Sequence, residues 1–245
     1  PLFVLGWQDI AWLWPLMGSV SLWAALRMGL APLAGLAAAV QLGAFVVHYL
    51  SGWGDPAPGT EPPLFLSQHF FTSLVQVLAW IVSAGLLHAA ERRPAEDERR
   101  PMLPALLASP RVLWAPLLAG IAGWVVHWFA EFGRAAYVWG HPHWHTGLMV
   151  LVLLATGLLM RGVARVHQWP QMALASLAVL PGLALVALSD AATGPSSPFM
   201  PSHDLGLLAW PPPLAWHLWA PRRWPAAAPV GALVEELPDV LGAQR

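Results

Sequence analysis

The sequence lacks cysteine and lysine and carries few charged side chains. Among its 245 residues there is no cysteine, and all twelve basic residues are arginine. The lack of cysteine excludes disulfides, thiolate metal ligands, iron–sulfur clusters and cysteine nucleophiles. The lack of lysine excludes a retinal Schiff base and other lysine-based covalent chemistry. Charged residues make up 10% of the chain, against about 25% in soluble domains. The net charge of −1 offers no electrostatic basis for nucleic-acid binding.

Hydrophobic residues make up 57% of the chain and fall into long apolar runs. These runs predict an all-α, polytopic integral membrane helix bundle with about seven transmembrane helices, each near the roughly 20 residues that a bilayer requires. The predicted spans lie near 3–26, 28–50, 64–89, 112–133, 143–163, 170–190 and 204–220. The bundle would occupy residues 1–223, and residues 224–245 would form a cytoplasmic C-terminal tail. The seventh span is short and contains three prolines, 211–213, which leaves open whether it crosses the membrane fully or re-enters.

The arginines indicate how the bundle is oriented. Eleven of the twelve fall in loops or tails on one side of the predicted bundle, and only Arg134 falls on the other. Because positively charged loops stay on the cytoplasmic side, this distribution predicts that the N-terminus is outside and the C-terminus inside.

The ten histidines are distributed unevenly across this topology. Three lie at inner ends of spans, namely His88, His167 and His217. Seven lie at outer ends, namely His48, His69, His127, His141, His143, His145 and His203. Any one of them is explained by the tolerance of the membrane interface for a residue with one apolar and one polar side. As a set, ionisable residues at membrane depth raise a functional hypothesis.

Four-residue spacings place some of these groups on a shared helix face. His141 and His145 are four apart, as are His145 and Met149, and His127 and Glu131. The first pair shares a face only if the helix has begun by His141. Imidazole with thioether suits copper, especially Cu(I), whereas imidazole with carboxylate would also suit zinc or iron.

The order of short motifs resembles the CtaG-type cytochrome c oxidase assembly factors, a family of seven-helix bacterial membrane proteins. The third span begins LSQHFFTSL, where Ser67 and His69 match the family motif and Ser73 stands in place of its second histidine. The fourth span contains VVHW, which supplies His127. The fifth begins HPHWHTGLMV, where His141 and His145 match.

Later positions extend the resemblance to roughly residues 60–220. The fifth span has Leu148 and Met149 where the family has a Glu-His pair. The further matching residues are Pro142, Gly157, Pro181, Asp204, Gly206 and Trp210. Two family histidines are therefore absent, at Ser73 and Met149.

The resemblance implies a non-enzymatic role in maturing a haem–copper cytochrome c oxidase in the bacterial cytoplasmic (inner) membrane, by handling copper at the periplasmic face. Its partners would be the lipid bilayer and oxidase subunits. The implied ligands are His69, His127, His141, His145 and Met149, with His143 and His203 as additional ones. Glu131 and Asp204 would be outer-shell partners that orient imidazole N–H groups.

Three other interpretations stay open. The departures from the motif favour a non-catalytic accessory subunit of a larger respiratory or photosynthetic complex that has lost metal binding. A b-type cytochrome would hold haems near both faces, and His69 and His88 are about 28 Å apart along a helix. An intramembrane metal hydrolase would use His141 and His145, with Glu131 as the base.

The predicted orientation is testable because the chain has no native cysteine to remove. We expect a Ser51→Cys variant to react with a membrane-impermeant thiol reagent in intact spheroplasts. An Ala95→Cys variant should react only after the membrane is opened. Labelling of Ala95→Cys but not Ser51→Cys in intact spheroplasts would invert the topology.

Overall fold

The protein is described by a computed structural model over residues 12–50, 64–92, 110–141, 144–192 and 211–219. Within these ranges the secondary structure is helical and contains no strand, which confirms the all-α prediction. The chain divides into two compact units, residues 1–138 and 139–245. Each unit is described by itself.

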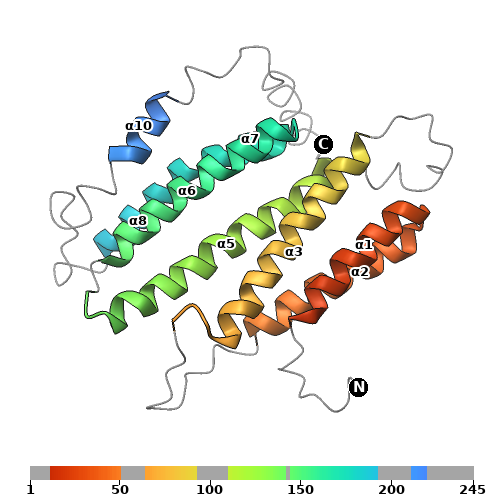
Figure 1. The fold of residues 1–245 in the computed structure, drawn as a ribbon, viewed down its shortest axis with the longest axis horizontal. Helices are drawn as coiled ribbons and strands as arrows, with labels where there is room; N and C mark the ends of the chain where they lie inside the picture. The colour runs from red at the N-terminus through yellow and green to blue at the C-terminus, as the bar shows by residue number, and fades with distance from the viewer. Residues whose placement is uncertain (1–11, 51–63, 93–109, 142–143, 193–210, 220–245) are drawn as a thin grey trace, which may run out of the picture. The chain divides into compact units, whose positions relative to one another are not determined.

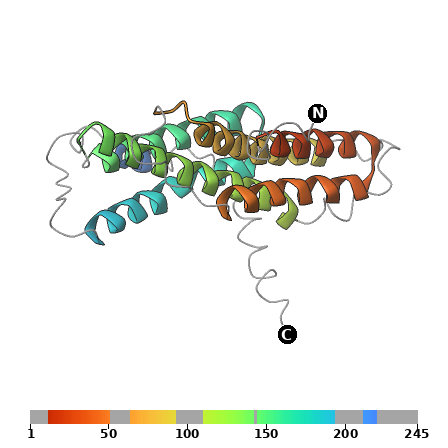
Figure 2. The ribbon, with the colours of Figure 1, turned by 90° about the horizontal axis from the view of Figure 1, so that it is seen from below.

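The first unit opens with a helical hairpin. Helix α1 covers Leu13–Met28 and α2 covers Ala31–Leu50, and the two lie side by side in Figures 1 and 2. Gly29 ends α1 with a φ of 70°, a left-handed conformation that glycine adopts at little cost. The Leu30 N–H then donates to the Ala25 carbonyl at 3.1 Å. This cap lets the chain reverse direction between the two helices.

Helices α3 (Gln68–Glu91) and α5 (Pro110–Val138) complete the first unit. Helix α3 packs against α1, α2 and α5. It begins where the Ser67 hydroxyl accepts a hydrogen bond from the Phe70 N–H at 3.0 Å, as an N-cap serine does. Helix α5 is longer than the predicted span 112–133, so Arg134 lies within a helix rather than in an outer loop.

The second unit contains α6 (Trp144–Val166) followed by an interrupted helix. Residues Pro170–Ala175 form α7, Ser176–Ala178 form a 3₁₀ turn, and Val179–Ala192 form α8. The interruption falls where Pro181, lacking an N–H, cannot bond to the carbonyl four residues earlier. Helices α7 and α8 and the turn between them all pack on α6.

The last described helix, α10, covers Pro211–Trp219. The three prolines of the predicted seventh span, 211–213, stand in the first turn of this helix, where their missing N–H groups would have no partner within the helix. With nine residues, α10 is about 14 Å long at the usual rise and does not cross a bilayer by itself.

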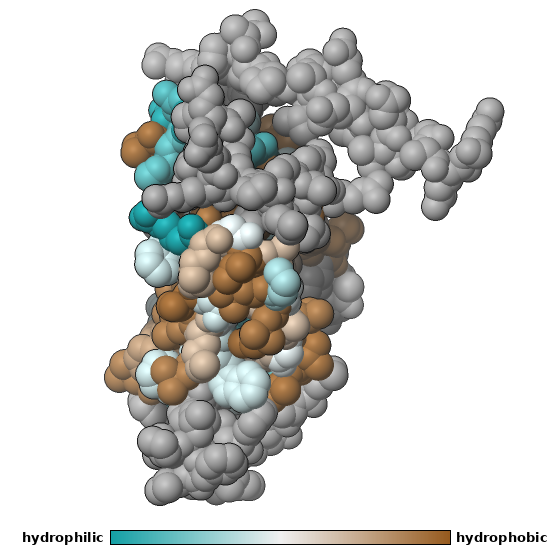
Figure 3. Space-filling model, turned by 90° about the vertical axis from the view of Figure 1, so that its right-hand side faces the viewer, coloured by the Kyte–Doolittle hydropathy of each residue, from teal (hydrophilic) through white to brown (hydrophobic). Residues whose placement is uncertain are grey.

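Many large apolar side chains point outward, and many small or polar ones point inward. Leu16, Val20, Leu36 and Leu42 are all more than a third exposed, while Ala25, Ala37 and Ser83 are almost fully buried. In Figure 3 the coloured side chains in the middle of the view are mostly hydrophobic. Soluble proteins rarely expose such continuous apolar surface, whereas membrane helices pack through small residues and face lipid with large ones.

Four helical segments are long and apolar enough to cross a membrane: Ala31–His48, Gln68–Glu91, Val112–Val138 and Trp144–Val166. They correspond to four of the seven predicted spans and indicate a membrane protein. The other described helices are shorter than a span. The orientation, the single bundle over residues 1–223 and the tail at 224–245 stay predictions, and the tail lies outside the described residues.

A buried cluster of hydrogen bonds joins the three helices α1, α2 and α3. The Gln41 side chain of α2 donates to the Ser19 hydroxyl of α1 at 3.0 Å and to the Ser83 hydroxyl of α3 at 2.7 Å. Ser19 also contacts the Ala79 carbonyl at 3.1 Å. Such bonds hold helices together where lipid offers no hydrogen-bonding partner.

Replacing Gly18 should disturb this cluster, because a Cβ there would lie 2.4 Å from Gln41 Cγ and 3.1 Å from the Ala37 carbonyl oxygen. We expect Gly18→Ala to lower the free energy of unfolding by about 1–3 kcal/mol, as overpacking does. The measurement is thermal unfolding in detergent, followed by tryptophan fluorescence.

The matched control is Gly43→Ala, since a Cβ at that helical position meets nothing within 4 Å. It should be neutral or stabilise the protein by up to about 1 kcal/mol, because alanine favours a helix over glycine. Equal melting temperatures for the two variants would contradict the packing described for Gly18.

Candidate functional site

Three histidine side chains converge at one end of the first unit. His48 lies in the last turn of α2, His69 in the first turn of α3, and His127 in α5. The His48 and His69 rings stack with centroids 4.6 Å apart. His127 lies within electrostatic range of both. The Nε2 atoms of all three are buried.

The direction of the helices explains this convergence. Helix α2 ends at the same end of the unit where α3 begins, and α3 and α5 pack together along their lengths (Figure 1). Consequently, the end of α2, the start of α3 and the later turns of α5 meet. The sequence order predicts the three histidines on one side of the membrane, and the packing brings their side chains together at one end of the unit.

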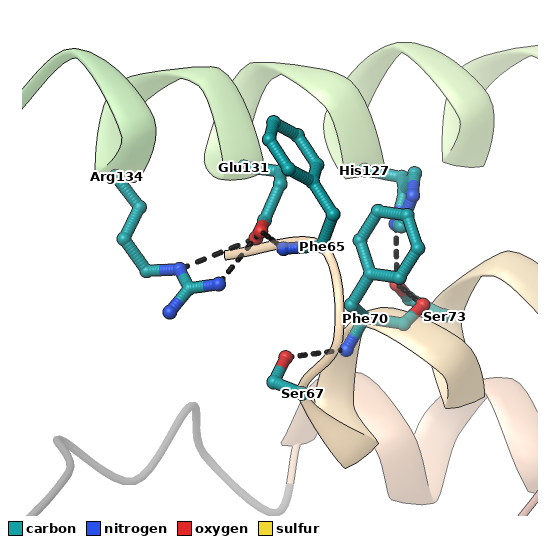
Figure 4. A network of polar contacts seen from close by, with 7 residues as sticks. All are labelled: Phe65, Ser67, Phe70, Ser73, His127, Glu131 and Arg134. Atoms are coloured by element: carbon teal, nitrogen blue, oxygen red, sulfur yellow. Dashed lines mark hydrogen bonds and ion pairs between the residues drawn. The ribbon is translucent and has the colours of Figure 1, made fainter. Parts of the chain in front are cut away.

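Ser73 holds the His127 ring, as Figure 4 shows. The Ser73 Oγ lies 2.5 Å from His127 Nδ1. The same hydroxyl donates to the Phe70 carbonyl at 3.1 Å. His127 is only 3% exposed, and its Nε2 makes no hydrogen bond with any residue that the structure describes.

A carboxylate and an arginine lie beside the histidines. Glu131 Oε1 accepts from the Phe65 N–H at 2.6 Å and from Arg134 Nη2 at 2.6 Å, and Arg134 Nε donates to Oε2 at 3.3 Å (Figure 4). Phe65 has a φ of 60°, which is uncommon for a residue with a side chain. Glu131 therefore fixes the turn that leads into α3, and Arg134 balances its charge. Its predicted role of orienting an imidazole stays a prediction.

Aromatic rings surround His127. The Phe70 ring centroid is 4.7 Å and the Trp128 centroid 5.2 Å from the imidazole. Trp124 lies at 6.5 Å. Trp128 in turn stacks on Phe132 at 5.1 Å. These rings make the surroundings of His127 largely apolar.

The other predicted ligands belong to the second unit or lie outside the described residues. The helix α6 begins at Trp144, so His141 precedes it and the expected shared helix face of His141 and His145 does not form. The His141 ring instead stacks on Trp144 with centroids 4.4 Å apart. His145 and Met149 do share α6, where Met149 is fully buried. His143, His203 and Asp204 lie outside the described residues.

His48 is one of the seven histidines predicted at outer span ends, but it is not among the ligands that the resemblance implies. The omission arose because the motifs of the resemblance begin near residue 60, after His48. The position of His48 could have indicated its place in the cluster. His48 lies near the end of the second predicted span, and His69 lies near the start of the third, on the same predicted side of the membrane.

The fit of this cluster to a metal ion is partial. Within the described ranges, no three His, Asp or Glu side chains are arranged to enclose a metal as they stand. His127 Nε2 is nevertheless a buried nitrogen without a hydrogen-bond partner among the described residues. Enclosing an ion with His48 and His69 as further ligands requires a change of side-chain rotamer that separates their stacked rings.

Comparisons with known proteins add no assignment. No protein-family model matches the chain, and neither does any curated protein or solved structure.

Glu131 should order the turn before α3 through its bond to the Phe65 N–H. We expect Glu131→Ala to speed hydrogen exchange at the Phe65 amide by about tenfold or more, since a net hydrogen bond to a charged group contributes about 1.5–3 kcal/mol. The measurement is amide hydrogen exchange in detergent micelles.

Glu131→Gln is the matched control, because its side-chain carbonyl still accepts from Phe65 while its charge to Arg134 is lost. Exchange at Phe65 should change much less than in Glu131→Ala. Equal acceleration in both variants would assign the order of the turn to the ion pair instead.

Proposed function

We propose that this chain is a membrane-embedded copper-handling factor that assists the assembly of a haem–copper cytochrome c oxidase. The observation that carries the proposal is the convergence of three imidazoles with buried Nε2 atoms from three different helices, His48, His69 and His127. Buried ionisable residues in membrane helices are costly, so they are expected to serve a function. The motif order described above supports the choice of oxidase assembly.

The chemistry of the cluster suits copper as a cargo. Imidazole is a good ligand for copper, and the chain has no cysteine thiolate, which would hold the ion more tightly. The charge of Glu131 is balanced by Arg134 at 2.6 Å, so little net negative charge is available to hold a cation. A monovalent ion loses less hydration energy on burial than a divalent one, which favours Cu(I) in this setting. Neutral imidazole ligands with little negative charge nearby also favour release of the copper ion to a partner.

A second candidate function is a structural subunit of a larger membrane complex. Two observations favour it. No three candidate ligands in the described residues are arranged around a metal position, and His48 and His69 stack as packing rings do. In this case the histidines would stabilise the helix ends and would bind no ion.

Elemental analysis distinguishes the two functions. The protein is purified from cells grown in copper-replete medium, beside a His69→Ala/His127→Ala double variant. We expect near-stoichiometric copper in the unaltered chain and loss of most of it in the double variant. The matched control is His88→Ala/His167→Ala, which removes two imidazoles from the other ends of α3 and α6 and should keep its copper.

The absence of copper, zinc and iron from the purified protein would contradict copper handling and favour the structural subunit. Equal loss of copper in both double variants would also contradict the assigned site. In cells, removal of the chain should leave the oxidase with haem but deficient in copper. A fully metallated oxidase in such cells would contradict the role in assembly.

A further inference from the structure

We infer that Ser73 is a positioning residue that fixes which ring nitrogen of His127 carries the hydrogen. In this arrangement Nδ1 carries it and Nε2 is left with a bare lone pair. The inference deepens the copper-handling function proposed above and rests on it for its biological meaning. The tautomer itself is a separate property that can be measured without any metal.

The Ser73 hydroxyl has a single hydrogen to donate. A serine hydroxyl donates one hydrogen bond and accepts others through its lone pairs. Ser73 donates its hydrogen to the Phe70 carbonyl at 3.1 Å. Its contact with His127 Nδ1 is shorter, 2.5 Å, and by itself allows either atom to donate. Both contacts are hydrogen bonds at once only if the serine oxygen accepts from the ring nitrogen, because the hydroxyl has a single hydrogen. A neutral imidazole with its hydrogen on Nδ1 has none on Nε2.

The opposite tautomer fits the surroundings less well. It would place a hydrogen on His127 Nε2, which is buried and has no hydrogen-bond acceptor among the described residues. A buried N–H without an acceptor is rarer in proteins than an acceptor atom that lacks a donor. The apolar rings of Phe70 and Trp128 beside the imidazole offer no better acceptor. The Ser73 contact and the lack of an acceptor at Nε2 therefore both favour the tautomer with its hydrogen on Nδ1.

This tautomer is the one that a metal ligand requires. A coordinating histidine gives one nitrogen lone pair to the ion and donates the N–H of the other nitrogen to an outer-shell group. In many sites that group is a carboxylate, which makes the imidazole more basic and the metal bond stronger. Here the group is a neutral hydroxyl, so His127 is oriented without that gain in basicity. Such a ligand suits an ion that has to be released.

The position of Ser73 in α3 makes this role compatible with His69 as a second ligand. Ser73 follows His69 by four residues, so the two lie one helical turn apart on the same face. Ser73 is only 1% exposed, so water does not compete for its hydroxyl. At the position where the resemblance led us to expect a histidine, a serine instead orients the histidine of the neighbouring helix.

The test is nitrogen-15 NMR of ring-labelled histidine in the metal-free protein in detergent micelles. The His127 signals are assigned by their loss in His127→Ala. We expect protonated Nδ1 and bare Nε2 in the unaltered protein. In Ser73→Ala the signals should shift toward the tautomer with hydrogen on Nε2, which free imidazole side chains prefer. Ser73→Thr, which keeps the hydroxyl, should restore the original spectrum.

The matched control is Ser83→Ala, which removes another buried hydroxyl from α3, one bonded to Gln41 rather than to a histidine. It should leave the His127 signals unchanged. Copper titration of the same proteins should show affinity about 10- to 100-fold weaker in Ser73→Ala, as for other outer-shell substitutions. If Ser73→Ala does not fold, the spectrum of the unaltered protein decides: bare Nδ1 overturns the inference.

The possible results separate this inference from the proposed function. An unchanged His127 spectrum in Ser73→Ala overturns the positioning role, even if the protein binds copper. A shifted spectrum in a protein that never binds copper supports the positioning role and overturns copper handling. A shift of similar size in Ser83→Ala shows a general loss of structure and overturns the specific role of Ser73.

Discussion

Helices surrounded by lipid gain little from burying leucine, because lipid tails are as apolar as the side chain itself. Association therefore depends on small residues that let backbones approach and on hydrogen bonds that lipid cannot offer. The first unit follows this constraint closely. Gly18 admits the Gln41 side chain, and Gln41 ties α1 to α3 through Ser19 and Ser83. Many large apolar residues lie on the outer surface.

Helix α3 has a special place in this arrangement because it packs against α1, α2 and α5. Its buried polar residues include Ser73, Gln76 and Ser83, which face neighbouring helices. The later ones hold the helices together through Gln41, and Ser73 holds His127. The constraint that stabilises the fold thus also orients the candidate ligand. Structure and site are built from the same kind of bond.

The electrostatics of the site leave little net negative charge beside the histidines. Glu131 is bound by Arg134 and by the Phe65 N–H, so its negative charge is largely used to shape the turn into α3. The three imidazoles contribute no charge when neutral. A cation bound there, as the proposed function requires, would be held by nitrogen lone pairs with little help from charge.

The sequence by itself determined the class of protein, the approximate helix positions and the side of the membrane on which the histidines were expected. Composition and the length of apolar runs decide these properties, because a bilayer sets both the length and the polarity of a helix that crosses it. The sequence also singled out His69, His127 and Ser73 as noteworthy positions in α3 and α5. It could not say that Ser73 contacts His127, since 54 residues separate them.

Only the tertiary structure decided which of these residues meet. It added His48 to the cluster, placed His141 before the start of α6, and placed three prolines in the first turn of α10. Side-chain partners between helices depend on helix rotation and on the exact turn at which each helix begins. A rotation of one residue, about 100° around a helix, moves a side chain from the interior to the lipid face. A hydropathy average over a span carries no information on that rotation, whereas the packing of neighbouring helices determines it.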